Sequence, residues 1–336
     1  RLSRGLGDVY KRQHLLYIYK NFLMEKRKVQ KLKLGIAIPT YNRLEKLKVL
    51  LNSIDNQILS KDLDLSLFIS NIASTDGTSE FLEEEVQKRY NLKVYNRPED
   101  QTIKPNIFYL NKIISSDIEW VWFMGDDDKL SEKNSLQKVY ECLKENNIND
   151  LEFFCACEKR RSRNTSKVFI DKVFNLCNKF GYHEMLGWFS SIILRKQTFQ
   201  KVIDDIGQSV TTQYKNFDDA ITSAYPHSAS ILKHTHDKNG LFYDFGLVET
   251  QDKLQTIETQ KRWVEENMLW RYFHVIDDIE NLINQKILEP NSLNLSFFRY
   301  HTIFLWDHLI FLTFKRLPQY IHSRSDINDI NNHIQI

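Results

Sequence analysis

The sequence predicts an α/β protein whose central sheet is mostly parallel and flanked by helices. Short apolar segments at residues 34–39, 63–70, 92–95 and 120–124 alternate with segments in which apolar residues recur at helical spacing. This alternation indicates right-handed βαβ units, which build parallel sheets. In addition, polar loops directly follow several of these strands, and ligands of such sheets bind beyond the carboxyl ends of the strands.

Each element of the first half follows from its own pattern. An apolar run that ends at a proline predicts the first strand at residues 34–39. Leucines and an isoleucine at helical spacing predict a helix over residues 43–56. Alternation predicts a second strand at residues 63–70. The remaining elements are a turn at 74–78 that opens a helix, a strand at 92–95, an amphipathic helix at 106–114 and a buried strand at 120–124.

Patterns in the second half are weaker. The expected elements are helices at 136–143 and 199–206, strands at 152–157 and 190–194, and a polar, basic loop at 159–167. From residue 261 onward, apolar and aromatic residues recur at helical spacing. Residues 251–336 are therefore expected to form a helical C-terminal extension.

Residues 1–23 are expected to lie outside the native fold. Residues 1–13, RLSRGLGDVYKRQ, read as translated sequencing-adapter sequence, which makes Met24 the expected start. The apolar stretch LLYIYKNFL that precedes Met24 is too short and too weakly flanked to be a signal peptide. Fold assignment therefore begins at residue 24.

Composition excludes several functional classes. The chain has 336 residues, of which 42% are hydrophobic and 27% charged, and these values are ordinary for a soluble globular protein. Its net charge of +2 gives no support for a nucleic-acid partner. No apolar run approaches the roughly 18–20 residues that span a bilayer. The four cysteines lack zinc-like spacing and are expected to be buried free thiols, which fits a reducing cytoplasm.

The most informative segment is residues 119–130, EWVWFMGDDDKL. Its apolar run stops at a glycine, and Asp126, Asp127 and Asp128 follow. Adjacent carboxylates repel one another unless a positive charge lies between them. Carboxylate oxygens suit Mg²⁺ or Mn²⁺, ions that commonly bind together with phosphate. The alternative is a solvated acidic turn in which Asp128 or Ser131 caps the next helix.

Two earlier loops also follow strands. Residues 39–43, PTYNR, offer a flat ring and hydrogen-bonding groups, and residues 71–78, NIASTDGT, join turn residues to a helix N-terminus. Taken alone, each loop is more readily explained as an ordinary turn. Together and in this order, the three loops resemble those of the nucleotide-sugar glycosyltransferases of family 2, which have the GT-A fold. The resemblance is strong over residues 33–130 and weaker over residues 131–250.

This resemblance implies a GT-A domain at residues 24–250, with a nucleotide-binding half at 33–130 and an acceptor half at 131–250. It implies an inverting enzyme that uses Mn²⁺ or Mg²⁺ and takes a sugar from a nucleoside-diphosphate sugar donor. The implied acceptor is a hydroxyl group of a cell-surface glycan or lipid-linked saccharide, as in lipopolysaccharide or capsule biosynthesis. The implied location is the cytoplasm. The aromatic and basic C-terminal helices suit peripheral contact with the plasma membrane, although packing as a cap or dimer interface ranks first.

By the same resemblance, several residues of the first half surround the nucleotide. Pro39 and Tyr41 match positions that frame the nucleobase. Asn71 stands where the family usually has an aspartate that reads the base, and an amide both donates and accepts where a carboxylate only accepts. Arg97 and Asn106 match positions near the nucleotide.

The metal and the general base are assigned in the same way. The resemblance implies that Asp128 ligates the metal and that Asp126 contacts the ribose or the waters of the metal. Asp219 is the favoured base for the acceptor hydroxyl, with Asp218 in reserve, and a helix N-cap pair is the equally supported alternative. His227 either completes the metal or diphosphate site or is a structural histidine.

Three residues are candidates for the acceptor side. Glu184 is a third candidate base, Trp188 could stack on a sugar face, and Ser190 could bond to it. For Trp188, a place in the core is the commoner role of such a residue.

Two other functions are weighed against this one. The first is a degenerate, non-catalytic module that binds a sugar nucleotide, and the departures at Asn71 and Ile72 are its only support. The second is a nucleotidyltransferase, but residues 39–43 lack the glycine-rich loop of that class. A P-loop hydrolase is excluded because no G-x-x-x-x-G-K-[ST] segment occurs.

Overall fold

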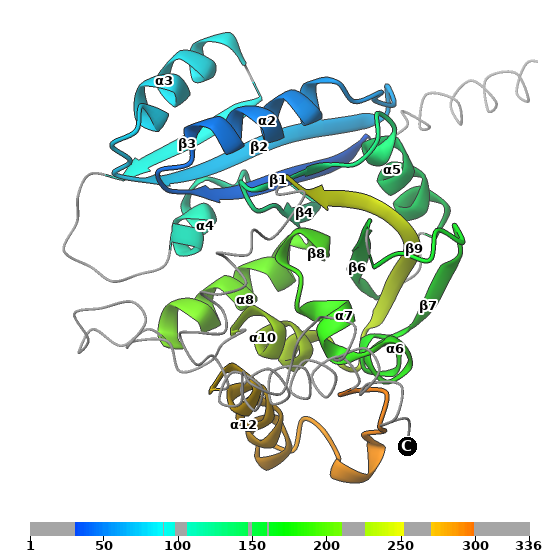
Figure 1. Ribbon diagram of the computed structural model, residues 1–336. Coiled ribbons are helices and arrows are strands. Elements are labelled where there is room, and N and C mark those ends of the chain that lie inside the picture. The colour runs from blue at the N-terminus through cyan, green and yellow to red at the C-terminus, as the bar shows by residue number, and fades with distance from the viewer. Residues whose placement is uncertain are drawn as a thin grey trace, which may run out of the picture.

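The structure is a computed structural model, and it describes residues 31–89, 91–97, 106–146, 150–159, 161–209, 226–251 and 270–298. These residues form one curved, nine-stranded sheet with helices on both faces (Figure 1). The strand order is β3-β2-β1-β4-β8-β6-β9-β5, and β7 pairs with β9 off this path. The predicted α/β class is confirmed. Residues 1–23 lie outside the described residues.

The first half of the chain builds the parallel part of the sheet. Its strands are β1 (Leu32–Thr40), β2 (Leu63–Ile72), β3 (Leu92–Arg97) and β4 (Trp120–Phe123), and the pairs that they form with one another are all parallel. Its helices are α2 (Leu44–Asp55), α3 (Thr78–Lys88) and α4 (Leu110–Ile113), and the 3₁₀ turn Asn106–Tyr109 leads into α4. The strands and helices predicted for this half are therefore present.

Continuous apolar runs form these strands because both faces of the sheet are covered. In β1, Ile36 and Ile38 pack into the core beneath α2 and α3, whereas Ala37 belongs to the core on the α4 side. In β4, Trp122 and Phe123 divide between the two cores in the same way. The polar residues after these strands therefore emerge together at one edge of the sheet.

Beyond β4 the sheet becomes mixed. The strands are β5 (Asp128–Leu130), β6 (Leu151–Glu158), β7 (Val168–Lys172), β8 (Ile192–Arg195) and β9 (Asn239–Thr250). β8 is antiparallel to β4 and β6, and β9 is parallel to β6 but antiparallel to β5 and β7. The predicted strand at 190–194 begins only at Ile192, because Phe189–Ser191 form a 3₁₀ turn. The sequence patterns did not predict β5, β7 or β9.

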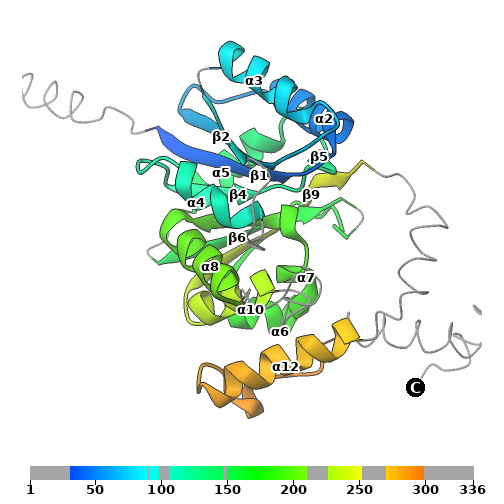
Figure 2. The same cartoon turned by 90° about the vertical axis from the view of Figure 1, so that its left-hand side faces the viewer.

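Helices of the second half pack on the mixed part of the sheet (Figure 2). They are α5 (Ser135–Glu145), α6 (Val173–Phe180), α7 (Tyr182–Leu186), α8 (Lys196–Ser209) and α10 (Pro226–Thr235). The predicted helices at 136–143 and 199–206 are α5 and α8. All four cysteines are buried and free, as predicted.

The described part of the C-terminal extension packs on the domain. Helix α12 (Trp270–Asn284) contacts α10 and lies on the side of that helix facing away from the sheet (Figure 2). Val275, Ile279 and Leu282 join the same core as α8 and α10. The short 3₁₀ helix Pro290–Ser292 follows. No helix among the described residues is long and apolar enough to cross a membrane.

Candidate active site

The first two loops are tied together at the carboxyl edge of the sheet. The main-chain N–H of Asn42 donates to Ser74 Oγ at 2.9 Å, and the side-chain oxygen of Asn42 accepts from the N–H of Thr75 at 2.7 Å. Asn42 adopts a left-handed conformation with φ of 49°, which asparagine tolerates better than most residues. The two loops therefore act as one rigid unit beside the acidic loop.

Asp76 anchors this unit to α2. Its carboxylate accepts hydrogen bonds from the N–H of Leu44 at 2.9 Å and from the N–H of Thr78 at 3.1 Å. Burial acts to raise the pKa of Asp76, but these bonds and the Thr78 hydroxyl outweigh it and hold the pKa below its ordinary value. The second loop thus carries an ionised carboxylate that the first turns of two helices stabilise.

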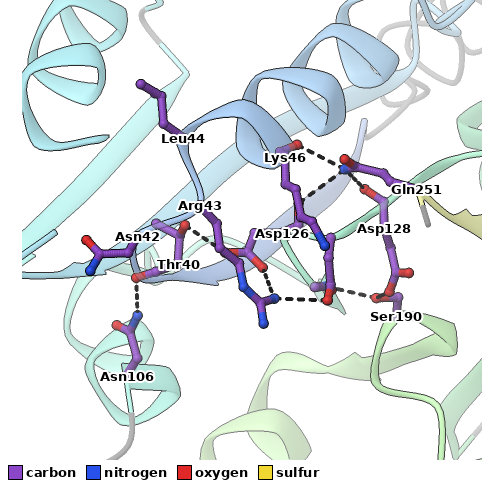
Figure 3. Close-up of polar contacts among 12 residues, drawn as sticks. Thr40, Asn42, Arg43, Leu44, Lys46, Asn106, Asp126, Asp128, Ser190 and Gln251 are labelled. Carbon is purple, nitrogen blue, oxygen red and sulfur yellow. Dashed lines mark hydrogen bonds and ion pairs between the residues drawn. The ribbon is translucent and has the colours of Figure 1, made fainter. Parts of the chain in front are cut away.

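Asp126 is held by residues of the first loop (Figure 3). One carboxylate oxygen accepts from Thr40 Oγ1 at 2.8 Å, and the other accepts from Arg43 Nη1 at 2.8 Å. The same Arg43 nitrogen lies 2.9 Å from Asp127 Oδ2. The guanidinium thereby supplies the positive charge that lets two neighbouring carboxylates approach.

Asp128 has a different environment. Its side chain is buried, and it accepts a hydrogen bond from Ser190 Oγ. Burial raises the pKa of Asp128 to about 7; the Ser190 hydroxyl opposes this, and the nearby charges of Asp127, Glu158 and Asp126 add to it. Within the described residues, no cationic side chain is ion-paired with Asp128. A divalent cation would supply the missing charge.

The residues present fit a hard divalent metal. Asp126 and Asp128 offer carboxylate oxygens at one edge of the sheet, and such oxygens are the ligands that Mg²⁺ and Mn²⁺ prefer. The part of the chain that the structure describes holds no complete group of three His, Cys, Asp or Glu ligands. Mg²⁺ commonly binds through one or two carboxylates together with water and substrate phosphates, so a complete protein cage is not required.

Ser190, for which contact with the acceptor is predicted, bonds to the acidic loop. Its hydroxyl accepts from the N–H of Gly125 at 2.8 Å and donates to Asp128, and its side chain is fully buried. Its carbonyl accepts from Trp122 Nε1 at 2.8 Å. Ser190 therefore joins the second half of the chain to the acidic loop.

Trp188 and Glu184 lie together around an arginine that the sequence did not single out. The guanidinium of Arg161 lies 5.0 Å from the centre of the Trp188 ring, and its Nη1 is 3.9 Å from Glu184 Oε2. Both Trp188 and Glu184 are partly buried. Glu158, at the end of β6, is close enough to Asp128 to influence its pKa. Arg161 thus joins Trp188 and Glu184, and Glu158 is the residue of this region that influences the acidic loop.

Asn71 is fully buried, and its side chain is engaged within the protein. Its amide donates to Ser79 Oγ at 2.9 Å and to Asn96 Oδ1 at 3.1 Å. Its oxygen accepts from the Ser74 hydroxyl. Both amide hydrogens are therefore used to hold the second loop against β3.

The other predicted nucleotide residues lie near this unit. The side chain of Asn106 donates to the carbonyl of Thr40 at 2.6 Å. Arg97 is buried, with its guanidinium 4.7 Å from the centre of the Tyr109 ring. Pro39 is partly buried, whereas Tyr41 is 56% exposed and presents its ring to solvent.

His227 is the second residue of α10 and lies against Phe189, the neighbour of Ser190. The two rings meet edge to face, with centres 5.7 Å apart. Burial lowers the pKa of His227 to about 4, while bonds to the backbone of Leu186 and Gly187 oppose that shift. The imidazole is therefore neutral near neutral pH. Asp218 and Asp219 lie outside the described residues.

Sequence reasoning did not assign Arg43 or Gln251 to the acidic loop. Arg43 stands in the PTYNR segment, where an arginine beside a predicted metal loop could have been noticed. Gln251 reaches the loop from the end of β9, and its amide donates to the carbonyl of Asp128 at 2.8 Å. No local pattern marks Gln251, because the strand that carries it was not predicted.

The fold brings these three loops together at the edge of a parallel sheet, which is where the ligands of such sheets bind. Residues 35–202, half of the chain, match the model of the family described as Glycosyl transferase family 2. The chain belongs to this family and is a family 2 glycosyltransferase with a GT-A fold, as the resemblance implied.

Among characterised proteins, the chain is similar to Abequosyltransferase RfbV of Salmonella typhimurium (strain LT2). The two are 27% identical over 195 residues, which is 54% of this chain and 58% of the relative. The chain thus spans little more than half the length of that relative.

Solved structures similar to this chain include TarS 1–349 of S. aureus, with a TM-score of 0.44, 17% identity, and coverage of 70% of this chain and 65% of that one. A second is the mannosyltransferase PcManGT from Pyrobaculum calidifontis in complex with GDP-Man and Mn²⁺. Its TM-score is 0.49 at 12% identity, and the match covers 80% of this chain and 71% of the other.

Proposed function

We propose that this chain is an inverting, divalent-metal-dependent glycosyltransferase. It moves a sugar from a nucleoside-diphosphate donor to a hydroxyl of a cell-surface glycan or lipid-linked acceptor. The observation that carries the proposal is the environment of Asp128. This carboxylate is buried, its pKa is raised to about 7, and no cationic side chain among the described residues forms an ion pair with it. A protein keeps such a destabilising group where function needs it, and perturbed carboxylates cluster at functional sites.

The donor would lie across the three loops. Tyr41 offers an exposed ring for the nucleobase, and Arg43 offers a cation beside the acidic loop for the diphosphate. Asp128 and Asp126 would hold Mn²⁺ or Mg²⁺, which when bound stabilises the departing nucleoside diphosphate as a Lewis acid. Asn71, Arg97 and Asn106 would support the loops around the nucleotide.

The acceptor would approach from the second half of the chain. Trp188 and Glu184, joined through Arg161, are proposed to bind it. Direct displacement at the anomeric carbon requires a carboxylate that takes the proton of the acceptor hydroxyl. Asp219 is the proposed base, with Asp218 in reserve, and His227 is a proposed neutral neighbour of the metal or diphosphate.

The class of acceptor rests on two supports. One is the family resemblance, and the other is similarity to a protein named as an abequosyltransferase, which is an enzyme that transfers a sugar. An envelope glycan such as lipopolysaccharide or capsule follows as the proposed product. Transfer of the sugar to such an acceptor would take place in the cytoplasm, with the enzyme in peripheral contact with the inner face of the plasma membrane.

The test uses the full chain with UDP-, GDP- and CDP-sugars, each with and without Mn²⁺. We expect one donor to be turned over in a metal-dependent way, with release of the nucleoside diphosphate and inversion at the anomeric carbon. Asp219→Asn should abolish turnover while leaving nucleotide binding intact. Full activity of Asp128→Ala in the presence of a chelator would contradict the metal role.

A non-catalytic sugar-nucleotide binding module is the second candidate. The observation in its favour is that the amide of Asn71 donates to Ser79 and Asn96. These bonds give Asn71 a structural role at the position where the family usually has the aspartate that reads the base. Calorimetry with UDP, GDP and CDP plus Mn²⁺, followed by the turnover assay, separates the two functions. Binding with no turnover of any donor, in the presence of acceptor extracts, would favour the module.

A further inference from the structure

Gln251, the residue after β9, contacts the backbone of all three aspartates. Its main-chain N–H donates to the carbonyl of Asp127 at 3.0 Å. Its side-chain amide lies 2.8 Å from the carbonyl of Asp128 and 3.2 Å from that of Asp126 (Figure 3). One residue thus contacts three successive carbonyls of the acidic loop.

The same amide also reaches α2. Its nitrogen lies 2.9 Å from the carbonyl of Lys46, in the first half of that helix. The ladder between β5 and β9 pairs Asp128 with Thr250, so Gln251 continues the contact from the end of the ladder onto the loop. The acidic loop, α2 and β9 therefore share this one side chain.

Such a contact controls geometry without touching the carboxylates. The rotamers open to an aspartate side chain depend on the backbone that carries it, so a restraint on the backbone of the loop also restrains the direction of its carboxylates. Carbonyls with no donor would also be free to turn toward a bound cation and alter its coordination. Groups behind the ligands commonly set metal affinity in this way.

We propose that Gln251 is a positioning residue of the metal and diphosphate site, acting through the backbone of Asp126, Asp127 and Asp128. The inference rests on the proposed function, because it assigns Gln251 to the metal site named there. Gln251 contacts neither the sugar nor the reacting atoms. Its contribution is to hold the loop in the arrangement that binds Mn²⁺.

The test compares Gln251→Met with Gln57→Met. Both changes keep the approximate length of the side chain and remove its amide donors. Gln57 is a matched control, because its amide also joins two elements by donating to the carbonyls of Ser53 at 3.0 Å and Glu132 at 2.7 Å. Its contacts do not involve the acidic loop.

We expect both variants to lower the melting temperature, and only Gln251→Met to weaken Mn²⁺ binding. Mn²⁺ alone is titrated into the full chain, and the free ion is followed by electron paramagnetic resonance. The expected loss of affinity is about 10-fold, the lower end of what such supporting groups contribute. In turnover with saturating metal, the KM for the donor should rise more than kcat falls.

Two results would overturn the inference, and they can be told apart. Equal Mn²⁺ affinity for the wild type and Gln251→Met would contradict the positioning role of Gln251 and would not affect the proposed function. A wild-type chain that binds no Mn²⁺, either alone or in the presence of UDP, GDP or CDP, would contradict both the metal dependence and the role assigned to Gln251.

Discussion

Ser190 donates a hydrogen bond to the carboxylate of Asp128, although 62 positions separate them in the chain. The hydroxyl of Ser190 also accepts from the N–H of Gly125, at the start of the same loop. A residue in the second half of the chain thereby favours the ionised form of a carboxylate in the first half, because the Ser190 hydroxyl acts to lower the pKa of Asp128.

The first prediction follows from this link. Burial raises the pKa of Asp128, and the Ser190 hydroxyl opposes it, so Ser190→Ala should raise that pKa further. A lost hydrogen bond to a charged group, about 1.5 kcal/mol or more, corresponds to roughly one pKa unit. Since the ionised carboxylate binds metal, Mn²⁺ affinity near neutral pH should fall about 10-fold and recover at higher pH. Affinity measured across a pH series checks this, and Ser191→Ala, a change at a buried neighbour, should behave as wild type.

The second prediction concerns stability. The folded-state pKa of Asp128, about 7, lies above its ordinary value of 3.8, so folding favours the protonated form. The stability that Asp128 contributes is therefore present at acid pH and is lost as pH rises toward 7 and above. In metal-free protein at about pH 8, the ionised group costs at most about 4 kcal/mol. Asp128→Asn should be more stable than wild type there, and the difference should vanish near pH 4.

Thermal unfolding across pH, with and without Mn²⁺, measures this difference. Mn²⁺ should raise the melting temperature of the wild type and leave that of Asp128→Asn unchanged. If Asp128→Asn is less stable than the wild type at alkaline pH, the hydrogen bonds of Asp128 stabilise its ionised form in the folded protein, and the prediction is wrong.

The third prediction concerns Tyr41. Tyr41 is 56% exposed, so Tyr41→Ala should change the free energy of unfolding by less than about 0.5 kcal/mol. Stacking of a base on an aromatic ring contributes about 1–3 kcal/mol, so nucleoside-diphosphate affinity should fall at least about 10-fold. Calorimetry with UDP, GDP and CDP plus Mn²⁺ measures the loss. Tyr41→Phe should retain binding, and unchanged affinity in Tyr41→Ala would place the base elsewhere.

The fourth prediction concerns Asn71. Asn71→Leu removes hydrogen bonds to Ser79, Asn96 and Ser74 and leaves their polar groups unsatisfied in a buried place. The expected loss is about 2 kcal/mol in urea unfolding. Asn71→Asp should lose less, because the hydroxyls and the amide of Asn96 can turn to donate to a carboxylate. Equal stability of Asn71→Leu and wild type would show that the network contributes nothing.

The nucleotide half could be predicted because its signals are local. Strands covered on both faces are apolar runs, and the polar residues after them stand out by contrast. Leu32–Thr40 and Trp120–Phe123 were recognisable in this way, as were the helices between them. The exposed ring of Tyr41 and the three carboxylates follow the ends of these strands.

The second half was harder to predict, because its elements depend on distant partners. Strand β9 contains Gly240, Asp244 and Gly246, which interrupt any strand pattern. Asp244 is buried there because the N–H of Arg163 and the hydroxyl of Thr165 donate to it, each at 2.8 Å. A buried carboxylate is tolerated only with such partners, and they lie on a loop far away in the chain.

The sequence by itself determined the chemistry at the sheet edge: an aromatic ring, turn residues and three consecutive aspartates. The tertiary structure alone decided how those aspartates are held. Arg43, Ser190 and Gln251 reach them across 83, 62 and 125 positions. A hydrogen bond between such distant residues depends on how the sheet brings its strands together, and spacing along the chain carries no trace of it.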